Sequence, residues 1–134
     1  MKRKVLFLCT GNSARSQMAE VLLRHLAGEH FDAFSAGTAP EQVDPRTIQA
    51  LEDFVFSAEG LHSKSLGDLG DQFFDFVISL CDKATQECKN FPNASEMMAW
   101  DFEDPRSRSG LKPFEITLRE INERIKMFVL VQTK

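Results

Sequence analysis

Cys9 and Arg15 are the residues whose types and spacing point most directly to chemistry. A short segment of small and polar residues that joins an apolar run to a helical pattern can curl into a ring of N–H donors around a tetrahedral oxyanion. The Cys9 sulfur would then lie beneath the central atom, and the planar guanidinium of Arg15 would match two of its oxygens. The same donors stabilise a thiolate. The predicted oxyanion-binding segment comprises Thr10, Gly11, Asn12, Ser13, Ala14, Arg15 and Ser16.

This segment is not a nucleotide-binding loop, because it holds one glycine and lacks the Gly-Lys-Ser/Thr ending. Instead it combines a nucleophile, an anion cradle and a fixed positive charge within eight consecutive residues. We expect the hydroxyls of Ser13 and Ser16 to donate further hydrogen bonds to the sulfur or to an anion oxygen. The spacing therefore predicts a cysteine nucleophile that attacks a bound oxyanion.

Two further cysteines, Cys81 and Cys88, complete an odd number of thiols, so the three cannot all pair within the chain. A disulfide scaffold is not expected. A zinc site is not favoured either, because six residues separate Cys81 from Cys88 and only His25, His30 and His62 could complete it. The thiols are then either buried apolar residues or part of the chemistry.

The elements that position these residues follow from hydrophobic periodicity. Short apolar runs at 5–8 and 76–80 are typical of strands buried on both faces, the alternation over 31–36 predicts a strand closed by Gly37, and 97–100 predicts a shorter one. Asp44-Pro45 is a helix start, and a first helix should end near Gly28. The expected buried helix stripes are Met18, Val21, Leu22, His25 and Leu26; Ile48, Leu51 and Val55; and, after Pro113, Phe114, Leu118, Ile121, Ile125 and Phe128.

Strands that alternate with helices predict an α/β fold with a four-stranded, doubly wound parallel sheet flanked by helices, built as one domain over residues 1–134. Ligands bind such sheets beyond the carboxyl ends of the strands. Cys9 and Cys81 each follow a predicted central strand. Two thiols are therefore expected on the functional edge of one sheet.

Composition excludes several classes of function. The chain has 134 residues, 43% of them hydrophobic and 27% charged, with a net charge of −4, which argues against a disordered chain and against nonspecific binding to nucleic acid. No apolar run is long enough to span a membrane. The apolar run behind the basic residues 2–4 is too short for a secretion signal, so we expect a cytoplasmic protein. We also expect a monomer, since core assignment leaves no exposed apolar stripe.

The run from Val5 to Ser16, extended by Gln17–Glu20 and Ser35–Gly37, resembles the signature of the low-molecular-weight protein tyrosine phosphatase superfamily. Within that superfamily the chain is most similar to the thioredoxin-coupled arsenate reductases. The resemblance implies a low-molecular-weight tyrosine phosphatase-like fold, arsenate as substrate with phosphate or sulfate as its mimic, and no cofactor beyond an external thiol reductant. It also implies a relay in which Cys9 forms an arsenate adduct, Cys81 attacks it, and Cys88 passes the disulfide on to thioredoxin.

The spacing of Cys81 and Cys88 makes its own prediction. On a regular helix, seven residues place the two Cα atoms ~10.5 Å apart along the axis. A disulfide requires Cα atoms within about 7 Å. Oxidation would therefore unwind the segment between them and expose the bond to a reductant, which chemically could be thioredoxin, glutaredoxin with glutathione, or mycothiol.

The resemblance assigns Asp104, before Pro105, as a general acid. Residue types alone do not separate it from Glu96, Asp101 or Glu103. The chain contains no tyrosine, and Arg106-Ser107 stands where the phosphatases carry paired tyrosines, which weakens the phosphotyrosine interpretation.

The resemblance also relates Asn12, Glu20 and Ser35 to a potassium site, but His62-Ser63-Lys64-Ser65 stands where a further aspartate would lie. We therefore assign no firm metal site and interpret these three residues as braces of the loop. Two alternatives to a reductase stay open: a low-molecular-weight protein tyrosine phosphatase that acts through Cys9 and Asp104, and a binding module that senses anions or redox state without turnover.

Overall fold

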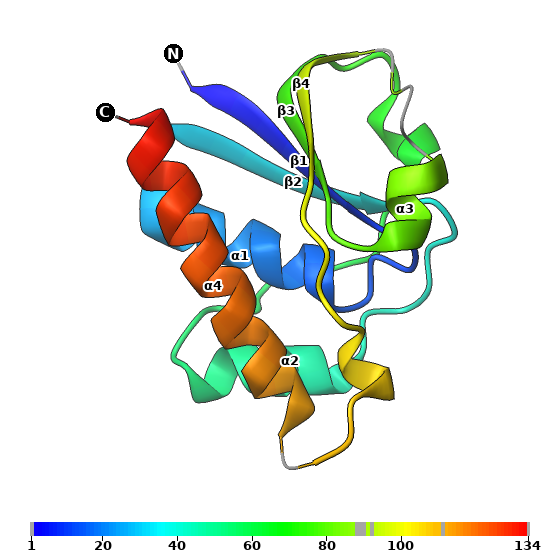
Figure 1. Ribbon diagram of the computed structural model, residues 1–134, viewed down its shortest axis with the longest axis vertical. Coiled ribbons are helices and arrows are strands. Elements are labelled where there is room, and N and C mark those ends of the chain that lie inside the picture. The colour runs from blue at the N-terminus through cyan, green and yellow to red at the C-terminus, as the bar shows by residue number, and fades with distance from the viewer. Residues whose placement is uncertain (1, 88–90, 92, 111, 134) are drawn as a thin grey trace.

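The computed structural model describes residues 2–87, 91, 93–110 and 112–133, and Figure 1 shows the path of the chain. Strands and helices alternate along it, as the periodicity predicted. In chain order the elements are β1 Arg3–Cys9, α1 Arg15–Ala27, β2 Phe31–Gly37, α2 Pro45–Asp53, the 3-10 helix η1 Leu66–Leu69, β3 Phe74–Ser79, α3 Asp82–Glu87, β4 Ala94–Ala99, the 3-10 helix η2 Pro105–Ser107 and α4 Pro113–Gln132.

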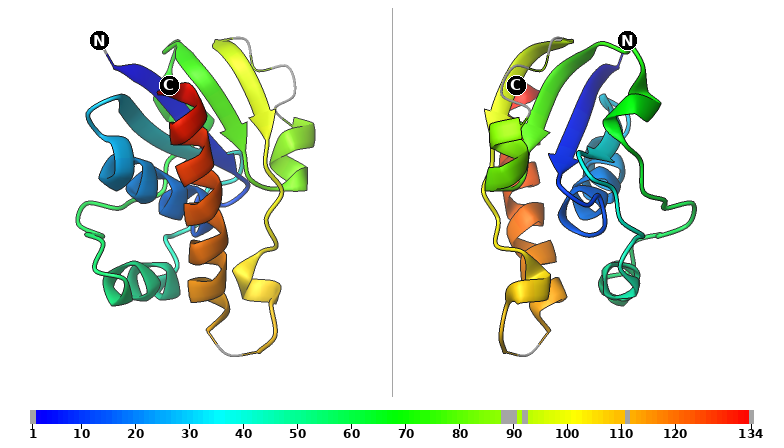
Figure 2. Two further views of the ribbon diagram at one scale, coloured as in Figure 1. Left: turned by 60° about the vertical axis from the view of Figure 1, so that its left-hand side comes forward. Right: turned by 90° about the vertical axis from the view of Figure 1, so that its right-hand side faces the viewer.

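The four strands form one parallel sheet in the order β2-β1-β3-β4, which confirms the predicted α/β fold class. Helices α1, α2 and α4 lie on one face, and α3 and η1 lie on the other (Figure 2). The central strands β1 and β3 are covered on both sides, which explains why their sequences read as continuous apolar runs. Both strands end at the same edge of the sheet, next to Cys9 and Cys81.

Helix α2 begins where the sequence predicted, with Asp44 as its N-cap and Pro45 in its first turn. The predicted stripe was wrong at its far end. The helix ends at Asp53, and Val55 adopts a left-handed backbone (φ 64°) with its side chain 88% exposed. The buried residues of α2 are instead Thr47, Ala50 and Leu51.

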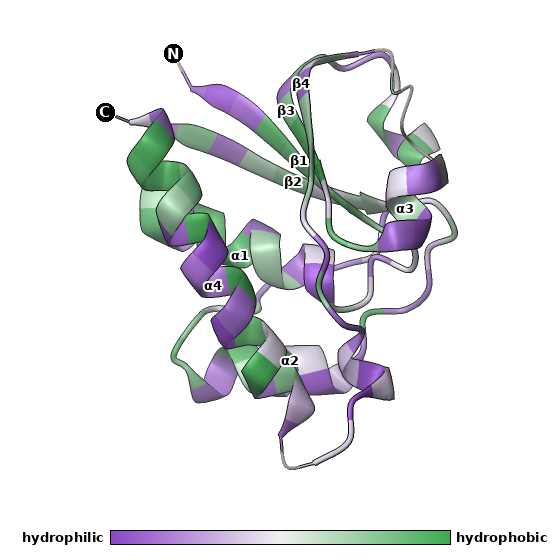
Figure 3. Ribbon diagram, viewed as in Figure 1, coloured by the Kyte–Doolittle hydropathy of each residue, from purple (hydrophilic) through white to green (hydrophobic). Residues whose placement is uncertain are grey.

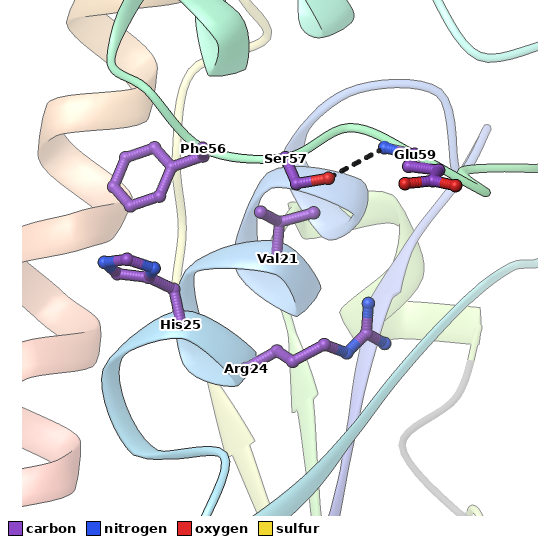
Figure 4. Close-up of a pocket in the computed structure, with 6 residues that line it drawn as sticks. All are labelled: Val21, Arg24, His25, Phe56, Ser57 and Glu59. Carbon is purple, nitrogen blue, oxygen red and sulfur yellow. Dashed lines mark hydrogen bonds between the residues drawn. The ribbon is translucent and has the colours of Figure 1, made fainter.

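The predicted core position of His25 on α1 was also wrong. Helix α1 is buried from Arg15 to Leu23, but its last turn is exposed at both His25 and Leu26. His25 lies edge-on against Phe56, with ring centroids 4.8 Å apart, at the side of a surface pocket between α1 and residues 56–59 (Figure 4). Periodicity identifies the face of a helix, whereas burial here depends on how far along the helix its neighbours extend.

The stripe predicted for α4 is confirmed, since all five of its apolar side chains are buried. Near the end of this helix Phe128 packs against Trp100, with ring centroids 5.8 Å apart. Trp100 also contacts the ring of Phe7, and the guanidinium of Arg124 lies over the indole at 5.1 Å. These contacts anchor the segment that leaves β4, which later carries Asp104.

The surface does expose apolar side chains, contrary to the expectation on which a monomer was predicted. Met127, Leu130 and Val131 of α4 are each more than 60% exposed, and this end of the helix appears strongly hydrophobic in Figure 3. Most residues of the edge strand β4 are exposed as well. The monomer stays a prediction. Within the described part of the chain, no helix combines the length and the apolar character that crossing a bilayer requires.

Gly37, the last residue of β2, lies against the backbone of the loop that follows β1. A Cβ atom at this position would lie 2.6 Å from the carbonyl oxygen of Thr10 and 3.0 Å from the amide nitrogen of Asn12. Both neighbours are backbone atoms, so a new methyl group could be accommodated only if the loop moved. Gly37 is thus required by close approach between two chain segments.

We expect Gly37→Ala to lower the free energy of unfolding by about 1–3 kcal/mol and to weaken phosphate binding, because the methyl group displaces the loop. Urea denaturation and calorimetric titration with phosphate measure the two effects. Gly67→Ala is the matched control, since its Cβ would meet Ser65 Oγ at an ordinary 3.6 Å. Unchanged phosphate affinity in Gly37→Ala would show that the contact does not shape the loop.

Candidate active site

The loop between β1 and α1 turns its backbone carbonyls away from its centre. Each carbonyl oxygen from Thr10 to Ala14 accepts a hydrogen bond from a neighbouring part of the chain, so these oxygens do not occupy the amide N–H groups of the loop. The donors are Ala39 N to Thr10 O (2.9 Å), Glu41 N to Gly11 O (2.8 Å), Gln17 Nε2 to Asn12 O (3.0 Å), Asp44 N (3.0 Å) and Thr47 Oγ1 (2.9 Å) to Ser13 O, and Met18 N to Ala14 O (2.9 Å). With its carbonyls paired in this way, the loop can offer its amide N–H groups to an oxyanion.

Asn12 braces the loop from within. Its backbone is left-handed (φ 50°), a conformation that asparagine tolerates better than most residues, and the residue is fully buried. Its Nδ2 donates to Ser16 Oγ (2.8 Å), and its Oδ1 accepts from Lys64 N (2.8 Å) and Gln17 Nε2 (3.0 Å). The Ser63 hydroxyl also donates to its carbonyl oxygen, at 3.1 Å. Every polar group of this side chain is therefore used to hold the turn.

Arg15, the first residue of α1, is 92% buried beside the loop. Its Nη1 donates to Phe102 O (2.9 Å), and its Nη2 lies 3.8 Å from Asp104 Oδ2. Its Nε is buried and has no acceptor among the described residues. A buried guanidinium N–H without a partner is costly, and an anion oxygen in the loop would satisfy it.

Cys9 and Cys81 lie together at the sheet edge, as their positions after β1 and β3 predicted. Both thiols are buried, each is the largest influence on the pKa of the other, and the Thr10 hydroxyl lies 3.4 Å from Cys81 Sγ. Leu80 N donates to Leu8 O at 2.8 Å, so the pairing of the two strands continues up to the two thiols. The second thiol is thus already next to the nucleophile.

The interaction between the two thiols shifts their pKa values in opposite directions. The neighbouring Cys9, with the Thr10 hydroxyl, the Ala84 N–H and Arg15, lowers the pKa of Cys81 to about 5 despite its burial. The neighbouring Cys81 and burial raise the pKa of Cys9, against the opposing effects of Arg15 and the Gly11 N–H. The pair therefore favours a thiolate on Cys81 at neutral pH, and a proton shift between the two would move that charge to Cys9.

Cys88 lies outside the described residues, so its predicted place in the relay stays a prediction. Cys81 itself stands directly before α3 rather than inside it. Its carbonyl oxygen accepts from both the amide and the hydroxyl of Thr85, at 3.0 Å each. The start of this six-residue helix therefore fixes the backbone of the second cysteine.

Asp104 is the predicted carboxylate that the structure brings to Arg15. It caps η2 and is held by Arg106, whose Nε lies 3.2 and 3.3 Å from the two carboxylate oxygens and whose Nη2 lies 3.1 Å from Oδ2. Burial acts to raise the pKa of Asp104, but these bonds, with the Arg106 N–H and Arg15, outweigh it and lower that pKa. Asp104 is therefore a carboxylate at neutral pH.

The other acidic candidates have different surroundings. Glu103 pairs with Arg108 at 2.8 Å, Glu96 is exposed on β4, and Asp101 is exposed in the following loop. Sequence reasoning did not separate these from Asp104, whereas the structure does so by their distance from Arg15. Sequence reasoning also missed Arg106, although a signal exists, because Asp104-Pro105-Arg106 repeats Asp44-Pro45-Arg46. In both sequences the guanidinium binds the aspartate through Nε and Nη2, a pair of bonds that we call the fork.

The residues around Glu20 do not fit a potassium ion. Glu20 Oε1 accepts from the Ser35 hydroxyl at 2.8 Å and lies 3.7 Å from Lys64 Nζ, while Oε2 pairs with Arg24 at 2.9 Å. The Asn12 side-chain oxygen accepts two N–H groups. The oxygens that would coordinate a cation thus already face donors and an ammonium group. Across the described residues, no three His, Cys, Asp or Glu side chains gather as metal ligands.

A loop with paired carbonyls, a cysteine at its start and a buried arginine at its end is the arrangement of the phosphatase class of cysteine-based oxyanion site. The family description "low molecular weight phosphotyrosine protein phosphatase" matches residues 4–133. The chain belongs to this family.

Similar proteins within this family are arsenate reductases. "Arsenate reductase 2" of Staphylococcus saprophyticus is 33% identical over 127 residues, which cover 95% of this chain and 96% of that protein. A solved "arsenate reductase in the phosphate binding state" superimposes with a TM-score of 0.82 at 29% identity, over 96% of this chain and 97% of that one. A thioredoxin-dependent arsenate reductase from Corynebacterium glutamicum gives 0.78 at 26% identity, over 95% of this chain and 60% of that one.

We expect Cys81→Ala to lower the pKa of Cys9, because both effects of Cys81 on that thiol raise it. Conversely, Cys9→Ala should raise the pKa of Cys81 above about 5 by removing the largest effect that lowers it. Alkylation by iodoacetamide as a function of pH, resolved by site with mass spectrometry, measures both. The wild type provides the reference for each site, and a Cys9 profile that does not respond to Cys81→Ala would contradict the coupling of the two thiols.

Proposed function

We propose that this protein is an arsenate reductase that works by a three-cysteine relay. The observation that carries the proposal is the meeting of two buried thiols, Cys9 and Cys81, at the ends of neighbouring strands, where each shifts the pKa of the other. Phosphoryl transfer through a cysteine needs one thiol, whereas reduction of a bound oxyanion needs a second one within reach. The arsenate reductases similar to this chain support the same activity.

In the first step the loop amides and Arg15 hold arsenate, and the unpaired Nε–H of Arg15 donates to one of its oxygens. The Cys9 thiolate attacks arsenic, and the departing oxygen leaves as water. The Cys81 thiolate beside it accepts the proton that Cys9 must give up first. The Arg15 charge and the amide ring stabilise the charge that builds on the anion.

In the second step Cys81 is the nucleophile. Its thiolate attacks the Cys9 sulfur, the sulfur–arsenic bond breaks, and the bonding electron pair stays on arsenic. Two thiolate sulfurs are thereby oxidised to a Cys9–Cys81 disulfide, while arsenic(V) is reduced to arsenic(III) and leaves as arsenite. Before this attack Cys81 loses to solvent the proton that it took from Cys9, and the Thr10 hydroxyl and the Ala84 N–H, which lower the pKa of Cys81, favour its return to the thiolate.

In the third step Cys88 attacks Cys81, Cys9 leaves as a thiolate, and an external dithiol reduces the Cys81–Cys88 bond. We propose thioredoxin as this dithiol, because it is the reductant named for the similar Corynebacterium glutamicum protein. Glutaredoxin with glutathione and mycothiol are the alternatives that the assay separates.

Phosphatase activity is the second candidate function, favoured by the place of Asp104 3.8 Å from Arg15. A general acid at that point could protonate the leaving oxygen of a phosphate ester. Asp104 is held ionised by Arg106, however, and the chain has no tyrosine to line an aromatic cleft. We therefore rank this activity below arsenate reduction.

Arsenate-dependent oxidation of reduced thioredoxin, measured beside hydrolysis of an aryl phosphate, tests the proposed function. We expect sustained arsenate reduction by the wild type and about one turnover by Cys88→Ser, because the Cys9–Cys81 disulfide then has no internal attacker. Glutaredoxin with glutathione and mycothiol serve as comparison donors, and Arg108→Gln, outside the anion site, is the control. Sustained turnover by Cys88→Ser with thioredoxin alone would contradict the relay, and absent arsenate turnover with rapid ester hydrolysis would establish the phosphatase.

We also propose that the enzyme requires no potassium, because the Lys64 ammonium supplies the positive charge beside Glu20. Activity and thermal stability should be equal in KCl and NaCl of the same ionic strength. Lys64→Asp should lower stability through carboxylate repulsion with Glu20, and potassium should restore part of it, so the melting temperature becomes salt-specific. A wild type whose activity rises severalfold in KCl relative to NaCl would contradict the proposal.

A further inference from the structure

Arg106 links two segments on either side of the anion loop. Its guanidinium binds both oxygens of Asp104 and donates through Nη1 to Glu41 Oε2 at 3.0 Å. The Glu41 carboxylate lies against the loop itself, since a Cβ on Gly11 would meet Oε2 at 2.6 Å. Arg15, Asp104, Arg106 and Glu41 thus form a chain of alternating charge from the buried end of the site to the Gly11 side.

The fork leaves Asp104 without a free oxygen. Oδ1 accepts from the backbone N–H and the Nε–H of Arg106, at 3.0 and 3.3 Å. Oδ2 accepts from Nε and Nη2 of the same residue and faces Nη2 of Arg15. A carboxyl group that is to donate a proton needs one oxygen that carries it and points at the acceptor. Four N–H groups around two oxygens favour the ionised form instead.

We propose that Arg106 is a specificity-determining residue, which directs the site toward inorganic oxyanions and away from phosphate esters by holding Asp104 as a carboxylate. The inference rests on the proposed function for the identity of the oxyanion. It extends that function by assigning the choice between two substrate classes to one side chain outside the oxyanion loop.

The chemistry of the two leaving groups explains the choice. When the Cys9 thiolate attacks arsenate monoanion, the two protons of the anion depart with one oxygen as water, so no outside acid is needed. When it attacks an aryl phosphate dianion, the leaving oxygen carries carbon, and an outside acid must protonate it or it departs as a phenolate. An acid held ionised therefore slows the ester reaction and leaves the arsenate reaction unaffected.

Arg106→Gln tests the inference, because it removes the charge and the fork while Asp104 keeps its backbone cap. The readout is the hydrolysis of a series of aryl phosphates whose phenols differ in acidity. The hydrolysis rate of the wild type should depend steeply on the acidity of the phenol. The rate of Arg106→Gln should depend on it weakly, and this variant should hydrolyse phenyl phosphate about tenfold faster than the wild type, because general acid catalysis is then available. Arsenate reduction by the same variant should change less than about threefold.

The pH profile gives a second readout. An acid must be protonated to act, so ester hydrolysis falls as pH rises through the pKa of Asp104. Arg106 holds that pKa low. In Arg106→Gln the falling limb should therefore move to higher pH. Arg106→Lys, which keeps the charge without the planar fork, should give an intermediate position.

Two further variants separate the inference from a general disturbance. Arg106→Gln/Asp104→Asn should lose the gain in ester hydrolysis and return to steep leaving-group dependence. Arg46→Gln, which opens the same fork on the other Asp-Pro-Arg sequence, should behave as wild type. Two results would overturn the role of Arg106. One is that Arg106→Gln shows the same leaving-group dependence as the wild type, and the other is that its faster ester hydrolysis persists when Asp104→Asn is added. Failure of wild type to reduce arsenate would overturn the proposed function alone, since the ester readouts do not use arsenate.

Discussion

The outward orientation of the loop carbonyls is the constraint on which the rest of the site depends. A ring of inward amides exists only if every carbonyl behind it finds a donor, because a buried, unpaired carbonyl costs about 1–3 kcal/mol. Those donors come from residues 39–47, from Gln17 and Ser63, and from the first turn of α1. The oxyanion site is therefore a product of tertiary structure, although its inward-facing groups come from consecutive residues.

Sheet register imposes the second condition. Parallel pairing places Leu8 opposite Ser79, and the ladder continues through the bond from Leu80 N to Leu8 O. A shift of one residue in this register would turn one of the two thiols to the other face of the sheet. The buried apolar strands β1 and β3 thus fix how close the two sulfurs come, which couples the packing of the core to the redox chemistry that we propose at its edge.

The fold and the positions of Cys9, Cys81 and Arg15 could be predicted because they depend on local patterns. The strand ends place Cys9 and Cys81, and the loop spacing places Arg15. The bond from Arg106 to Glu41, the Lys64–Glu20 pair and the Glu41 contact with Gly11 could not be predicted, because each joins residues distant in sequence or depends on a side-chain conformation. The errors at His25 and Val55 have a related cause, since periodicity does not specify where a helix ends or where its cover stops.

The packing of Trp100 has a practical consequence. The chain has one tryptophan and no tyrosine, so its near-ultraviolet emission comes essentially from one indole. That indole is buried between Phe7, Phe128 and Arg124. The backbone N–H of Trp100 donates to the carbonyl oxygen of Ser79 at the end of β3. The backbone then passes through Phe102, whose carbonyl holds Arg15, to Asp104. Intrinsic fluorescence is thus a site-specific reporter, without an added label, of how the segment behind the guanidinium responds when an anion arrives.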